Sequence, residues 1–143
     1  MIKVWVDGSV REGNPGIGAF AFCVEKEGET IYTHAQELPK PATNNEAEYE
    51  AMIAALIWLK YNNHNNESCE IFTDSQLVHG HVIKGWKCNF PHLRTSRDVI
   101  KGMLNSMPFS VKVTWLGRFG NATANALAQA TTQAAKERKN GGV

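Results

Sequence analysis

Near the start of the chain, apolar side chains occupy every second position of a short stretch that ends in an acidic residue. Ile2, Val4 and Val6 are β-branched and are separated by single residues of other kinds, a period of two that predicts a half-buried β-strand. We expect this strand to end at Asp7, because the apolar run stops there and is followed by Gly8, which tolerates unusual dihedral angles. A carboxylate at the end of a buried strand is costly to keep ionised without a partner. The chain must therefore fold so that other groups reach Asp7.

Strand-like and helix-like segments alternate along the rest of the chain. The pattern from Thr43 to Glu46 is a capping box that opens the first helix, and a second carboxylate, Asp74, ends a short buried-strand pattern. After the first strand we expect strands at 18–24 and 30–38, a helix from 43 to about 61, a strand at 69–74, helices at 75–85 and 93–107, a strand at 111–116 and a helix at 121–138. This order predicts an α/β layer sandwich. Active sites in such folds lie outside the carboxyl ends of the central strands, where Asp7 and Asp74 are expected.

Length and composition are those of one ordinary globular domain. With 143 residues, 43% of them hydrophobic and 20% charged, the chain can bury a sizeable core. We expect one domain at 1–138 and a disordered tail at 139–143. The longest strongly apolar stretch, Ala51 to Leu59, is too short to span a membrane. The three cysteines, an odd number without metal-like spacing, favour a reduced, cytoplasmic location, and we expect a monomer.

Five short motifs occur in one order along the chain. They are Asp7-Gly8-Ser9, Asn14-Pro15-Gly16, Thr43-Asn44-Asn45-Glu46-Ala47-Glu48, Thr73-Asp74-Ser75-Gln76 and Asn121-Ala122-Thr123-Ala124-Asn125-Ala126-Leu127-Ala128. No single motif is specific, but the ordered set, which spans Ile2 to about Ala135, resembles ribonuclease H of type 1. The resemblance implies the ribonuclease H-like fold, a five-stranded mixed sheet in the spatial order 3-2-1-4-5 with helices on both faces. It also implies an endonuclease that hydrolyses the RNA strand of RNA–DNA hybrids with two divalent ions, Mg²⁺ or Mn²⁺.

Three of the four acidic positions that hold the metals in that family match this chain. They are Asp7, Glu48 and Asp74. Two divalent ions can stabilise the attacking water and the leaving 3′ oxygen of a phosphodiester in line, and Mg²⁺ prefers carboxylate oxygens. Solvated surface charge is the common alternative for any Asp or Glu, but Asp7 and Asp74 both terminate apolar strand patterns. The resemblance therefore implies that these three residues are catalytic metal ligands.

The fourth family acid falls on Asn125, which is the main departure from the family pattern. Its amide keeps a carbonyl oxygen that can bind a metal but carries no negative charge. Either the natural protein lacks the fourth acid, or an aspartate was replaced by its isostere to stop catalysis. Neighbouring Ala122, Thr123 and Gln129 are neutral where family members often carry acids, which favours a natural asparagine. We therefore keep Asn125 as a catalytic and metal-binding position and expect an active enzyme.

The resemblance also implies a set of substrate-binding residues. Polar groups that read the minor groove, where the 2′-hydroxyl distinguishes RNA from DNA, match Asn14, Asn45 and Gln76. A pocket for a DNA phosphate matches Thr43 and Asn121, although both also read as ordinary helix caps. In the loop where many members carry a catalytic histidine, this chain has Arg118, which either binds a phosphate or is a surface charge.

A basic insertion that many family members carry is missing here. The stretch from Gly85 to His92 is too short to hold the extra helix and loop. The basic residues that remain nearby are Lys84, Lys87, Arg94 and Arg97. Because this charge is sparse, we expect weaker phosphate-driven binding. For Trp86, in the same stretch, packing against the core is favoured over stacking on DNA.

Two other functions remain open at this point. The first is a binding module of the same fold, which recognises RNA–DNA hybrids without cutting them because of Asn125. The second is another nuclease of this fold, such as a junction resolvase or an integrase core. Their acids lie on similar elements, but they would leave the set of Asn14, Asn45 and Gln76 unexplained. A cleavage assay with Mg²⁺ and Mn²⁺ separates the first alternative from an active enzyme.

Overall fold

The computed structural model describes residues 1–141, apart from the side chains of Arg118 and Phe119, and its centre is one mixed five-stranded sheet. The strands are β1 (Ile2–Arg11), β2 (Ile17–Lys26), β3 (Glu29–Glu37), β4 (Cys69–Thr73) and β5 (Val111–Trp115). They lie in the order β3-β2-β1-β4-β5. The first three pair antiparallel, whereas β4 is parallel to both β1 and β5. The predicted strand order is confirmed.

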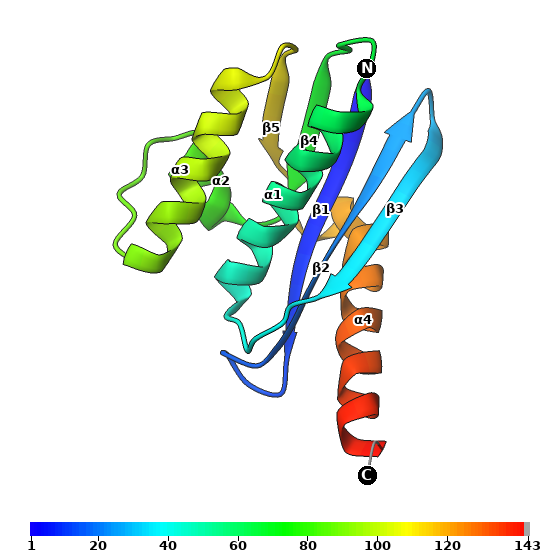
Figure 1. The fold of residues 1–143 in the computed structure, drawn as a ribbon, viewed down its shortest axis with the longest axis vertical. Coiled ribbons are helices and arrows are strands. Elements are labelled where there is room, and N and C mark those ends of the chain that lie inside the picture. The colour runs from blue at the N-terminus through cyan, green and yellow to red at the C-terminus, as the bar shows by residue number, and fades with distance from the viewer. Residues whose placement is uncertain (142–143) are drawn as a thin grey trace.

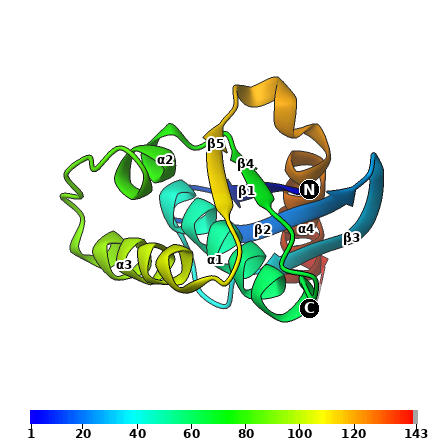
Figure 2. The same ribbon diagram turned by 90° about the horizontal axis from the view of Figure 1, so that it is seen from above.

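Helices cover both faces of the sheet, as expected. They are α1 (Asn44–Asn62), α2 (Gln76–Val82), α3 (Pro91–Ser106), a 3₁₀ turn η1 (Arg118–Asn121) and α4 (Ala122–Gly141). In Figure 1, α1 and α3 lie in front of the sheet and α4 lies behind β2 and β3. Figure 2, the view from above, shows α2 and α3 on the side of α1 that is away from β3.

The capping box fixes where α1 begins. The Thr43 hydroxyl accepts a hydrogen bond from the Glu46 amide (3.2 Å), and the Glu46 carboxylate accepts one from the Thr43 amide (3.0 Å). These two bonds satisfy donors that every helix start leaves unpaired. The helix then buries a continuous apolar face against β1, β2 and α3, made of Ala47, Ala51, Met52, Ala55, Leu56 and Leu59, each 0% exposed.

At one point α1 comes so close to β1 that only glycine fits on the strand. A Cβ atom added to Gly8 would lie 2.5 Å from the Ala47 carbonyl carbon and 2.5 Å from the Glu48 nitrogen. Any side chain there would force the helix away from the strand. The backbone contact therefore places Glu48 beside the residue that precedes Gly8, which is Asp7.

The first strand is longer than the sequence predicts. We expected its end at Asp7, but β1 continues to Arg11 because its antiparallel ladder with β2 runs from Ile2↔Lys26 to Arg11↔Ile17. What stops near Asp7 is the parallel ladder with β4, whose last pair is Val6↔Thr73. Asp7 thus lies at the carboxyl end of the β1–β4 ladder rather than at the end of its strand.

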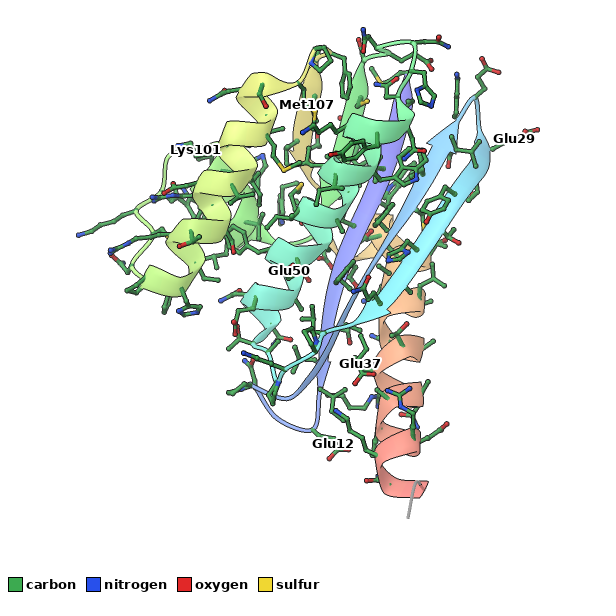
Figure 3. All side chains as sticks on the ribbon, viewed as in Figure 1. Glu12, Glu29, Glu37, Glu50, Lys101 and Met107 are labelled. Atoms are coloured by element: carbon green, nitrogen blue, oxygen red, sulfur yellow. The ribbon has the colours of Figure 1, made fainter. Side chains whose placement is uncertain are left out.

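The last helix also runs further than expected, to Gly141 instead of about Arg138. Its C-terminal half is fastened to the hairpin side of the sheet by ion pairs, with Lys136 bonded to Glu12 (Nζ–Oε1 2.6 Å) and both Arg138 and Lys139 bonded to Glu37. Figure 3 shows Glu12 and Glu37 beside this part of α4. Positions 139–141 of the predicted tail are therefore helical, and 142–143 lie outside the described residues. The boundary of the domain at residue 138 stays a prediction.

The close contact at Gly8 gives a first prediction. Replacing Gly8 by alanine should lower the free energy of unfolding by about 1–3 kcal/mol, the usual cost of overpacking. The matched control is Gly102 of α3, where no described atom lies within 4 Å of an added Cβ. Gly102→Ala should instead raise stability by about 0.5–1 kcal/mol through helix propensity. Urea unfolding of the two variants measures both, and equal effects would contradict the contact.

Candidate active site

Three carboxylates from three different elements meet at the carboxyl end of the β1–β4 ladder. Asp7 comes from β1, Glu48 from the second turn of α1, and Asp74 from the residue between β4 and the cap of α2. One carboxylate oxygen of each lies within 4.8 Å of those of the other two. The sequence named the same three residues, and the structure brings them together.

Burial makes this cluster electrostatically costly in the absence of a cation. Asp7 is 1% exposed, and burial followed by the charge of Asp74 raises its pKa from about 3.8 to about 6. Burial, then the charges of Asp7 and Asp74, also raises the pKa of Glu48 well above its usual value. Like charges in a low-dielectric site disfavour ionisation. The cluster is therefore held in the folded protein against its own repulsion.

The donor set fits a hard divalent cation. Glu48 Oε2 is buried and has no hydrogen-bond partner among the described residues, so this residue of the cluster keeps one buried oxygen unpaired. Hard cations such as Mg²⁺ and Mn²⁺ take carboxylate oxygens and usually only one or two protein carboxylates each. A positive charge at this point would satisfy the orphan oxygen and relieve the repulsion together.

Asn125 joins the cluster from α4, but as a hydrogen-bond donor. Its Nδ2 donates to Asp7 Oδ2 at 2.8 Å, and this bond works against the raised pKa of Asp7. Since the amide nitrogen points to Asp7, the amide oxygen is the atom left free for a metal. Asn125 is thus in contact with the predicted metal ligands, at the position where the family acid was expected.

Asn121, one helical turn earlier, has a structural contact in this fold. Its Nδ2 donates to the Val6 carbonyl at 2.7 Å, and the residue is 1% exposed. This bond ties the start of α4 to β1 next to Asp7. The side chain has almost no surface to offer a nucleic acid, and its Oδ1 is buried without a hydrogen-bond partner in the described part of the chain.

The other predicted substrate residues lie around the first turns of α1 and α2. Asn14 is exposed, and its Oδ1 accepts a hydrogen bond from the Asn44 amide at 2.9 Å, which ties the β1–β2 turn to the start of α1. Asn45 is half-buried in the first turn of α1, and Gln76 is the exposed first residue of α2. Asn14 therefore supports the helix start that also carries Thr43 and Asn45.

Arg118 and Trp86 are two residues for which the sequence allowed alternative roles. The backbone of Arg118 begins η1, whereas its side chain lies outside the described residues. Trp86 packs its indole on α2 at Gly80, where an added Cβ atom would lie only 2.0 Å from the ring. Trp86 is nevertheless 40% exposed, so the predicted packing covers only part of its ring.

Two contacts at the site were missing from the sequence analysis. The indole nitrogen of Trp115, the last residue of β5, donates to the Asp74 carbonyl at 3.3 Å. The hydroxyl of Tyr49, next to Glu48, bonds Nδ1 of His81 on α2 at 2.7 Å, with both residues buried. No local pattern indicates either contact, because the partners are 41 and 32 positions apart.

The mixed sheet with helices on both faces makes this an α/β protein. The three carboxylates clustered beside its central strand form a site of the kind that could hold a metal ion. Comparison with known families gives a more specific result, because the RNase H family model matches residues 1–136. The chain belongs to the RNase H family.

Individual relatives agree with that assignment. Ribonuclease HI of Halobacterium salinarum is 32% identical over 127 residues, which are 89% of this chain but only 62% of the relative's length. The crystal structure of RNase H1 from the same archaeon has a TM-score of 0.83 at 30% identity and covers 93% of this chain and 98% of that one. LC11-RNase H1, solved in complex with an RNA/DNA hybrid, has a TM-score of 0.84 at 25% identity and covers 94% and 99%.

Within residues 1–141, every helix is too short or too polar to cross a bilayer.

The crowded cluster predicts how the metal-free protein responds to pH. The pKa of Asp7 is higher in the folded state, at about 6, than in the unfolded chain, so folding favours its protonated form. Stability should therefore fall as pH rises from about 4 to above 6, by up to about 3 kcal/mol for this group. In Asp7→Asn this loss should be absent, making the variant more stable than the parent at pH 7. Urea unfolding with a chelator at pH 4–7 measures the difference, and parallel curves would contradict it.

Proposed function

We propose that this protein is a ribonuclease H, an endonuclease that hydrolyses the RNA strand of RNA–DNA hybrids. The observation that carries the proposal is the buried cluster of Asp7, Glu48 and Asp74 in a chain of the RNase H family. A related protein, LC11-RNase H1, was solved with an RNA/DNA hybrid, which supports the same class of substrate here.

Two Mg²⁺ or Mn²⁺ ions are the proposed cofactors, held by Asp7, Glu48, Asp74 and the amide oxygen of Asn125. When bound, such ions stabilise both the attacking water and the leaving 3′ oxygen of a phosphodiester. The protein's part is to hold the carboxylates where the β1–β4 ladder ends. Asn125 keeps the Asp7 carboxylate in one orientation through its 2.8 Å bond.

Recognition of the hybrid is assigned to the polar residues at the first turns of α1 and α2. Asn14, Asn45 and Gln76 would contact the minor groove, where donors and acceptors can recognise the 2′-hydroxyl. Thr43 would donate its hydroxyl proton to a DNA phosphate, because in the helix cap the hydroxyl oxygen only accepts a hydrogen bond. The burial of Asn121 argues that this residue supports the pocket from behind instead of touching the phosphate. The role of Arg118 as a phosphate ligand stays a prediction.

We further propose that the protein acts as a monomer in the cytoplasm. Its three cysteines, Cys23, Cys69 and Cys88, are buried free thiols, which suits a reducing compartment. The acidic cluster needs no residue from a second copy to be complete.

The alternative is a protein that binds hybrids without cutting them. Asn125 favours it, because one negative charge fewer faces the metals and the amide nitrogen is engaged with Asp7. A resolvase-like or integrase-like nuclease is not favoured, since the family and the relatives found are ribonucleases H.

Cleavage of a labelled RNA–DNA hybrid tests the proposed function. The native protein should cut the RNA strand in Mg²⁺ or Mn²⁺, and Asp74→Asn should lose this activity while keeping its fold. The matched control is Glu70→Gln, because Glu70 lies on β4, the strand that Asp74 follows, but bonds Thr114 and Lys112 instead of the cluster. Cleavage by Asp74→Asn at the rate of Glu70→Gln would refute the metal-site assignment, and hybrid binding without cleavage by the native protein would establish the alternative.

Asn125 gives a separate prediction about metal affinity. Asn125→Asp should tighten Mg²⁺ binding by about 10–100-fold, the range measured even for groups that only orient metal ligands. The reason is that a carboxylate oxygen is a stronger ligand for a hard cation than an amide oxygen. The native protein should favour Mn²⁺, which binds such sites more tightly than Mg²⁺ in general. Metal titrations of cleavage measure both effects, and superimposed curves for the two proteins would show that residue 125 does not contact the metals.

A further inference from the structure

A buried hydrogen bond connects the two helices that flank the acidic cluster. Tyr49 Oη and His81 Nδ1 lie 2.7 Å apart, and the two residues are 0% and 3% exposed. Tyr49 follows Glu48 directly on α1, and His81 lies near the end of α2. Among the described side chains, this is the only hydrogen bond or ion pair that joins α1 to α2.

The position of α2 matters because the helix begins immediately after a cluster residue. Asp74 is followed by the cap residue Ser75 and then by Gln76, the first residue of the helix. The start of α2 is held to the sheet, with the Ser75 amide donating to Thr73 Oγ1 at 3.1 Å and Trp115 donating to the Asp74 carbonyl. A tilt of this seven-residue helix about its anchored start would reorient Gln76 and strain the two bonds that hold the backbone of Asp74 and Ser75.

The Tyr49–His81 bond restrains the other end of α2. It joins that end to α1 at the residue next to Glu48, so the two helices cannot separate without breaking a buried bond. Leaving a buried donor or acceptor unpaired is costly. The segment after α2 folds back onto the helix through the Trp86 amide bonded to the Gly80 carbonyl at 3.0 Å, and its Cys88 carbonyl accepts a hydrogen bond from Arg94 of α3 at 2.7 Å. Neither contact joins α2 to α1.

We propose that Tyr49 and His81 are positioning residues that fix Asp74 and Gln76 relative to Glu48. The proposal rests on the proposed function, since it concerns the geometry of the same metal site. Neither residue touches the cluster in this role. Each acts through the helix that carries it, with Tyr49 holding α1 and His81 holding α2.

The protonation states of the pair suit a fixed bond. Burial raises the pKa of the Tyr49 hydroxyl, and burial followed by the charge of Arg97 lowers the pKa of His81. A neutral hydroxyl and a neutral imidazole result at physiological pH. In this state Tyr49 donates to Nδ1 and the imidazole proton resides on Nε2, the tautomer that we infer from the bond.

Calorimetric titration of Mn²⁺ into the protein without nucleic acid tests the proposal and does not depend on turnover. Tyr49→Phe and His81→Leu should each weaken Mn²⁺ binding by about tenfold, as the loss of groups that orient metal ligands does. His81→Asn should restore most of the affinity, because the asparagine amide oxygen can take the place of Nδ1 as acceptor. In hybrid cleavage, the rate deficit of Tyr49→Phe should shrink as metal concentration rises.

A matched control separates positioning from general stability. Ile100→Val removes one methyl group from a fully buried residue of α3 and no hydrogen bond, so it should lower stability while leaving Mn²⁺ affinity unchanged. Mn²⁺ affinity for Tyr49→Phe equal to that of Ile100→Val, or no recovery in His81→Asn, would overturn the proposal.

Failure of the proposed function would look different. In that case the native protein would bind no Mn²⁺ that depends on Asp74, and the role of the pair would be read from amide hydrogen exchange. Faster exchange across α2 in Tyr49→Phe than in Ile100→Val would still support a restraint on the helix, whereas equal rates would overturn it.

Discussion

The backbone contact between β1 and α1 at Gly8 is the constraint from which the site follows. With no side chain on Gly8, the helix lies against the strand at Ala47 and Glu48, so Glu48 reaches the cluster from the second turn of α1. The in-register β1–β4 ladder, which ends at Val6↔Thr73, brings Asp74 to the same point. Three carboxylates converge because one strand lies between a close helix and a parallel neighbour.

This convergence opposes folding, and the core of α1 provides the compensation. The raised pKa of Asp7, about 6, corresponds to up to about 3 kcal/mol of lost stability at neutral pH. Full burial of one large apolar side chain contributes about 1.5–3 kcal/mol, and Met52, Leu56 and Leu59 on the same helix are all 0% exposed. Burial of one or two such side chains is therefore comparable in size to the cost at Asp7.

The sequence predicted those parts of the structure that depend on local pattern. The capping box placed α1, and apolar strands followed by acids identified Asp7 and Asp74. The sequence analysis placed the end of β1 too early because Gly8 interrupts the apolar alternation, and the pairing of Ser9 to Arg11 with β2 is a tertiary effect. It also could not reveal the burial of Asn121 or the Tyr49–His81 bond, since each depends on which elements pack together and not on neighbours in the chain.

Asn125 has a property that the expected aspartate would lack. Its amide can donate to Asp7 and accept a cation at the same time, whereas a carboxylate can only accept. At 2.8 Å from Asp7 Oδ2, an aspartate would add a fourth negative charge to a cluster that already raises the pKa of two of its members. Asparagine instead supplies a hydrogen bond that favours the ionised form of Asp7. Compared with aspartate, Asn125 thus makes the metal-free protein more stable but lowers the affinity of the site for cations. The stability of the free protein and its affinity for metal therefore oppose each other at this one side chain.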